Sequence, residues 1–127
     1  MTEQEIRAMD GEQLTQAAWA LGLAPHGVRR SRVAATFFDE DERAWKPHER
    51  IAQADAVLRG LRTRGWIYSQ SWVPQRPAQR RGYIEAVKGL RHLGEHYTDT
   101  TDEPLALLRV SVRAVASEQK PQKEPTP

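Results

Sequence analysis

Apolar residues recur at the three- and four-residue spacing of a helix in three parts of the chain. The first part follows two capping signals. Thr2 and Glu5 have the spacing of a capping box, which predicts a short helical turn over residues 2–9. Asp10 can cap a second helix, which ends at Gly22, a residue suited to a left-handed stop. The apolar stripe of this helix consists of Leu14, Ala17, Ala18 and Leu21.

The other two helical stretches lie in the middle and near the end of the chain. Residues 48–64 carry an apolar stripe and are followed by Gly65, a residue typical of helix ends. The last helix begins near Thr101 or Asp102, either of which can cap it, with Pro104 in its first turn. The stripes are Ile51, Ala54, Val57, Leu58 and Leu61 in the middle helix, and Leu105, Leu108, Val112 and Val115 in the last.

Between these two helices the pattern changes to alternation, which is typical of strands. Residues 66–72 alternate aromatic residues with serine, and residues 83–88 separate Tyr83, Glu85 and Val87 from Ile84 and Ala86. Residues 90–97 predict a third strand, with Gly94 as a bend or bulge. The segment PQRPAQRRG, residues 74–82, predicts a loop because it holds two prolines and a glycine.

This order of elements predicts an α+β fold. Short connections make the strands pair antiparallel, and a sheet needs a covering layer of helices. We expect a layered α/β sandwich of two or three antiparallel strands with about three helices, and residues 33–38 as one further strand. One domain should cover residues 1–117, followed by a disordered, charged and proline-rich tail over residues 118–127. Arg109 and Arg113 should lie on the last helix opposite its apolar stripe.

Composition narrows the classes of function. The chain has 127 residues and no cysteine, so disulfides, thiolate metal sites and a cysteine nucleophile are excluded. No apolar run reaches the roughly 20 residues that span a bilayer, and the opening lacks a signal-peptide core, so we expect a cytoplasmic protein. Residues 59–91 hold eight basic residues against one acidic residue, a net charge of +7 that can attract anions.

The candidate binding site lies within this basic stretch. Arg76, Arg80 and Arg81 stand between Trp72 and Tyr83. Arginine offers a planar fork to phosphate, and an aromatic ring can stack on a base. The alternative is that the two aromatic residues pack in the sheet while the arginines are solvated.

Catalytic and metal-binding patterns are weak. The sequence contains no phosphate-binding glycine loop, nucleophile elbow or zinc-protease motif. His92 and His96 would share a strand face and, with Glu95, could bind a metal in a small hydrolase or nuclease. Two histidines make an incomplete site, so solvated or hydrogen-bonded histidines are the favoured interpretation. The acidic run at residues 39–42 is typical of an exposed loop. We therefore expect no enzymatic activity, no metal and no cofactor.

Three segments carry a resemblance to a known family: MTEQEIRAMDGEQL, IAQADAVLRGLRTRGWIYS and TDTTDEPLALLRVSVRAVAS. Together they resemble the phage ABA sandwich domain, a family of small bacteriophage and prophage proteins. The resemblance implies an α/β sandwich encoded by a phage or prophage. It implies no particular activity and no catalytic residues. The arginine-rich segment, the acidic run and the proline-rich tail depart from the family's pattern.

These observations lead to one functional hypothesis and two alternatives. The first is a phage-encoded, non-enzymatic binding protein that acts on a host protein or sequesters a small anionic, nucleotide-like ligand. The first alternative is a nucleic-acid-binding accessory protein that uses the loop at residues 76–81. The second is a structural protein that forms homo-oligomers through an open sheet edge.

Overall fold

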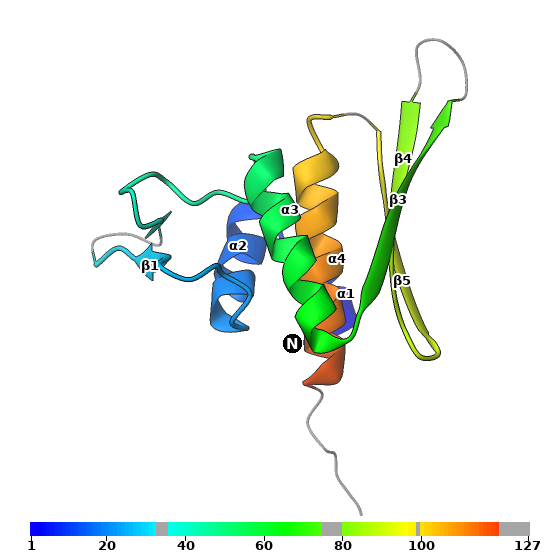
Figure 1. Cartoon of the computed structure of the whole chain (residues 1–127), viewed down its shortest axis with the longest axis horizontal. Helices are drawn as coiled ribbons and strands as arrows, with labels where there is room; N and C mark the ends of the chain where they lie inside the picture. Colours follow the sequence, from blue (N-terminus) through cyan, green and yellow to red (C-terminus); the bar gives the residue numbers. More distant parts are fainter. Residues whose placement is uncertain (33–35, 75–79, 99, 120–127) are drawn as a thin grey trace, which may run out of the picture.

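The computed structural model describes residues 1–32, 36–74, 80–98 and 100–119, with residues 72–74 and 80–81 described by their backbone alone. Within these residues the chain forms an α+β fold, as the sequence predicts (Figure 1). The helices are α1 (Glu3–Arg7), α2 (Gly11–Ala20), α3 (Ile51–Arg59) and α4 (Glu103–Glu118), with a short 3-10 helix, η1 (Gly60–Arg64), after α3. The strands are β1 (Arg29–Arg30), β2 (Phe37–Phe38), β3 (Ile67–Pro74), β4 (Arg80–Lys88) and β5 (Arg91–Tyr97).

The main sheet is antiparallel, with strand order β3-β4-β5. The two strand pairs keep one continuous register, from Ile67 opposite Val87 to Pro74 opposite Arg80, and from Gly82 opposite Tyr97 to Lys88 opposite Arg91. The prediction of a loop over residues 74–82 is therefore wrong at both ends, because strand pairing continues through them. The part of that prediction at residues 75–79 lies outside the described residues.

Gly94 does not form a bulge, because it pairs with Glu85 in an unbroken ladder. The glycine instead makes room for a neighbouring side chain. A Cβ atom built on Gly94 would lie 2.0 Å from the hydroxyl oxygen of Tyr83.

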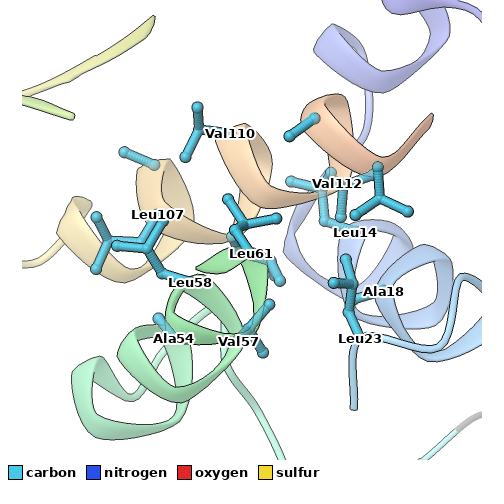
Figure 2. Packing of buried hydrophobic residues seen from close by; sticks show 14 of the residues in the cluster. Leu14, Ala18, Leu23, Ala54, Val57, Leu58, Leu61, Leu107, Val110 and Val112 are labelled. Carbon is cyan, nitrogen blue, oxygen red and sulfur yellow. The ribbon is translucent and has the colours of Figure 1, made fainter. Parts of the chain in front are cut away.

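Helix α4 is the centre of the molecule. It packs against β4 and β5 on one side and against α1, α2 and α3 on others, and Figure 1 shows the sheet and the other helices arranged around it. In Figure 2, Leu58 and Leu107 lie side by side, and Leu14 lies next to Val112, while Val110 points to another side of α4. The prediction of a single apolar stripe on this helix is wrong. Its buried residues lie on all sides: Pro104, Ala106, Leu107, Leu108, Val110, Ser111, Val112, Arg113, Ala114 and Val115.

The arginines of α4 do not lie on a polar outer side either, since Arg113 is buried and Arg109 is half-buried. Arg113 is 5% exposed, and its guanidinium binds Glu3 at 2.8 Å, Glu95 at 2.5 Å and the carbonyl of Gly94 at 2.7 Å. Arg109 donates to the carbonyl of Met9 at 3.0 Å. These bonds join α1 and β5 to α4, so the charges connect layers that the sequence alone does not place together.

The helix ends follow the local signals in most cases. The capping box predicted at Thr2 forms, Asp10 caps α2 as predicted, and Gly65 ends η1 in the left-handed region at φ 89°. Asp102 precedes α4 but does not cap it with its side chain, because its carboxylate accepts from the backbone N–H of Thr98 at 3.1 Å. Ile51, expected in the buried stripe of the middle helix, is 45% exposed because it stands at the first position of α3.

Residue Glu118 belongs to the folded domain, so the predicted tail begins too early. Its carboxylate accepts a hydrogen bond from the indole N–H of Trp66 at 3.0 Å and forms an ion pair with Lys88. The rest of the predicted tail, residues 120–127, lies outside the described residues.

A second, smaller sheet stands apart from the first, on the far side of the helices. Strand β2 pairs with β1 and then turns back, so that the N–H of Trp45 donates to the carbonyl of Phe37 at 2.8 Å. The acidic run forms this turn, since the carboxylate of Asp39 accepts from the N–H groups of Asp41 and Arg43. The predicted strand at residues 33–38 is confirmed only for Phe37–Phe38, and residues 33–35 lie outside the described residues.

Candidate functional site

The main sheet has one face packed on helices and one face left open. Alternation along the strands places Ile84, Ala86 and Tyr97 on the packed face, where all three are buried against the helical layer. In Figure 1 the described helices all lie on that side of the sheet. The opposite side is called the outer face here and carries Ile67, Ser69, Ser71, Tyr83, Glu85, Val87, His92, Gly94 and His96. Ile67 on this face is 72% exposed.

Two rings lie together on the outer face. Tyr83 and His96 are directly opposite in the β4–β5 register, with ring centroids 4.7 Å apart and planes inclined by 42°. The Tyr83 hydroxyl reaches the space above Gly94, two residues from its cross-strand partner. The Tyr83 ring therefore lies along the sheet instead of standing away from it. Tyr83 is partly exposed and His96 is exposed, so the pair is accessible to a ligand.

The histidines share the outer face, as the sequence predicts, but their carboxylate partner is a different one. His92 Nδ1 lies 3.4 Å from a carboxylate oxygen of Glu85 on the neighbouring strand. Glu95 lies on the packed face and binds Arg113, so it cannot complete a metal site with the histidines. In the described part of the chain, no group of three or more histidine, aspartate or glutamate side chains could hold a metal ion.

The other candidate residues lie at the far end of the β3–β4 hairpin. Arg80 and Arg81 are strand residues opposite Pro74 and Val73, and Trp72 is opposite Gly82. β5 pairs with β4 only from Gly82 onward, so the two arginines lie on the two-stranded part of the sheet, beyond the end of β5. Arg76 lies outside the described residues. The backbone thus brings Trp72, Arg80 and Arg81 to the end of the hairpin that adjoins Tyr83.

The end of the β3–β4 hairpin carries basic residues and no acidic ones in its sequence. Residues 71–84 contain three arginines and no acidic residue. Glu85 is the one acidic residue of the outer face as defined above, and it lies next to His92. The sequence of this hairpin end is therefore basic, which favours an anionic ligand over a cationic one.

Sequence reasoning missed His96 and Gly94 as parts of this site. A signal for both was present in the turn at residues 89–90, with Gly89 at φ 62°. A two-residue turn fixes the register of a hairpin, and that register places His96 opposite Tyr83. Tyr83 was a candidate from the sequence and is partly exposed in the structure, whereas its neighbours on the outer face follow only from the strand pairing.

Comparisons with known proteins add no family or function. No family model, curated protein or solved structure matches the chain. In the described residues, no helix is both long enough and apolar enough to cross a membrane.

Proposed function

We propose that the protein is a non-enzymatic binding protein whose outer face holds a ligand containing an unpaired base and a phosphate. The observation that carries this proposal is the Tyr83–His96 ring pair. It lies on an open sheet face, at the end where β4 continues into Arg81 and Arg80. A nucleotide has both required parts, either as a free molecule or as a unit of a single strand.

The proposed contacts follow from the chemistry of the two parts of a nucleotide. Bases stack on aromatic side chains whatever their sequence, with about 1–3 kcal/mol for each stacked base. Single-stranded RNA is bound in this manner on open sheets whose other face is covered by helices. Tyr83 lies along the sheet over Gly94, an orientation suited to stacking. At the adjoining end, Arg81 stands at an outer-face position of β4, like Tyr83, whereas Arg80 has the position of the packed face. Arg81 is therefore the first candidate for the phosphate, and Arg80 adds positive charge at the same end of the hairpin.

The test is fluorescence anisotropy of a labelled 12-nucleotide single strand, with unlabelled mononucleotides as competitors. We expect Tyr83→Ala to weaken binding by about tenfold, since one stacking contact is lost. We expect Arg80→Glu with Arg81→Glu to abolish binding, because the charge that would bind phosphate is reversed. Arg7→Glu with Arg43→Glu changes the net charge equally on exposed arginines elsewhere, and this control should weaken binding much less.

The same titrations separate the two sources of the ligand. Binding of the strand with a steep fall in affinity as salt rises indicates a nucleic-acid ligand. Tight competition by a single nucleotide indicates sequestration of the free molecule. Wild-type affinity in Tyr83→Ala and in the folded double arginine variant would contradict the proposal, and so would absence of binding to both probes.

The phage origin implied by the family resemblance stays a prediction, and so does a host protein as the partner. Under that prediction the protein binds its ligand in the cytoplasm of the infected cell. A homo-oligomer would need an exposed sheet edge, and in the described part of the main sheet β3 and β5 each pair with one strand only. Native mass spectrometry of the purified protein reads both the oligomeric state and any retained nucleotide.

A further inference from the structure

A cavity of about 320 Å³ lies in a different part of the molecule from the outer sheet face. Residues of α2, of β2 and of the segment 44–48 line it. Figure 1 places α2 and the small sheet across the helices from the main sheet, so a ligand here would not touch the outer face. Its size is near the lower end of the range of small-molecule pockets, about 300–1,000 Å³.

One wall of the cavity is apolar and well fixed. Phe37 and Trp45 pack edge to face, with centroids 5.9 Å apart and planes at 82°. Phe37 is 4% exposed and Trp45 is 2% exposed, so both are anchored in the core. Phe38 and Ala44 also line the cavity and are half-buried. This wall suits an apolar or aromatic group of limited size.

A second part of the lining is polar and is held by specific contacts. The hydroxyl of Thr15 lies 2.8 Å from His48 Nδ1, and Thr15 itself is buried. Gly11 makes the room for this histidine, because a Cβ atom there would come within 2.5 Å of the His48 ring. His48 is therefore fixed in position by α2 before any ligand enters.

Two charged side chains complete the lining, and neither is paired with another described residue. Glu12 and Lys46 both line the cavity. Neither the carboxylate of Glu12 nor the ammonium of Lys46 makes a hydrogen bond or ion pair with any described residue, and the two do not pair with each other. An unpaired negative group and an unpaired positive group beside one apolar wall match a ligand that carries both charges and an apolar substituent.

We propose that this cavity binds a small zwitterion with an apolar side group, of the chemical class of aromatic and large aliphatic α-amino acids. The ammonium group of the ligand faces Glu12, its carboxylate faces Lys46, and its side group lies against Phe37, Phe38 and Trp45. This site is separate from the outer face proposed to bind a nucleotide, so an experiment can refute one proposal without refuting the other.

The test uses three probes that share a phenyl group and differ in charge: L-phenylalanine, 2-phenylethylamine and 3-phenylpropionate. Their affinities are measured by isothermal titration calorimetry at pH 7, with ligand-observed NMR for weak binding. We expect L-phenylalanine to bind at least tenfold more tightly than either singly charged probe. Equal affinity of all three probes would refute recognition of both charges, and absence of binding by all three would refute the site.

Charge-removing variants assign each end of the ligand. Glu12→Gln should weaken L-phenylalanine about tenfold and leave 3-phenylpropionate unchanged, because the latter has no ammonium group. Lys46→Met should weaken L-phenylalanine similarly and leave 2-phenylethylamine unchanged. Asp41→Asn and Arg7→Met are exposed controls and should change none of the affinities. Equal weakening of all probes in either variant, or none, would contradict the assignment.

Discussion

Substitution of Arg113 by methionine should be one of the most destabilising single changes in the protein. The guanidinium is buried in α4 and binds Glu3 on α1 and Glu95 on β5. Burial by itself would lower the pKa of Arg113, but the two carboxylates raise it, so the group stays charged. Methionine keeps most of the apolar length of the side chain and removes the charge, which isolates the electrostatic part of the loss.

The size of the effect follows from the groups left behind. The Glu95 side chain is 14% exposed, and its remaining charged neighbour is Arg109 at 4.0 Å. Glu3 is 46% exposed at its side chain, so it can turn to water at little cost. Breaking a buried pair from one side costs about 3–5 kcal/mol. With Arg109 still near Glu95, we expect about 3 kcal/mol, against a total stability of about 5–15 kcal/mol for a domain.

The measurement is urea unfolding followed by tryptophan fluorescence, since Trp45 and Trp66 are both buried. Arg113→Met is compared with Glu95→Gln and with the double variant, which forms a double-mutant cycle. The double variant should be more stable than Arg113→Met alone, because it removes the buried carboxylate of Glu95, while the exposed carboxylate of Glu3 can turn to water. Arg7→Met, on an exposed arginine, should change stability by less than about 0.5 kcal/mol. A loss below about 1 kcal/mol in Arg113→Met, or no recovery in the double variant, would refute the reasoning.

Three further predictions concern the core and the end of α4. Gly82→Ala should lose about 1–3 kcal/mol in urea unfolding, because its Cβ would lie 1.9 Å from the buried Tyr97 ring. Leu107→Ala should lose about 2–5 kcal/mol, since Leu107 is fully buried at the centre of the helical layer. Burial raises the pKa of Glu118, but hydrogen bonds from Lys88 and Trp66 outweigh it and hold the pKa below its usual value. The carboxylate therefore stabilises the fold above its unfolded pKa, near 4.5, and this stability is lost as the pH falls through the lower folded pKa. Glu118→Gln should accordingly be less stable than the wild type at pH 7, with a difference that shrinks on acidification below pH 4.5. A pH-independent difference in urea midpoints would count against this assignment.

The sequence predicted which residues belong to the candidate site, but not how they are arranged. The residue types were visible in the sequence, since Tyr83 and the arginines stand out as an aromatic residue beside positive charge. Their arrangement was not, because strand pairing decides that Tyr83 lies beside His96 and that Glu95 faces Arg113 instead of the histidines. The cavity was missed altogether. It joins Glu12 and Lys46, which are 34 positions apart, and no periodic pattern relates such residues.

By itself the sequence determined the local structure. Capping at Thr2 and Asp10, the left-handed stop at Gly65 and alternation along residues 83–88 depend on near neighbours, so the residues that carry these signals also form the contacts. Only the tertiary structure decided that α4 is enclosed on all sides and that Arg113 binds Glu3. The physical reason is that burial on a second face is a property of docked layers. The sequence of α4, with one apolar stripe and two arginines, is typical of a surface helix. The helix is buried because carboxylates from distant elements, Glu3 on α1 and Glu95 on β5, neutralise the charge of Arg113.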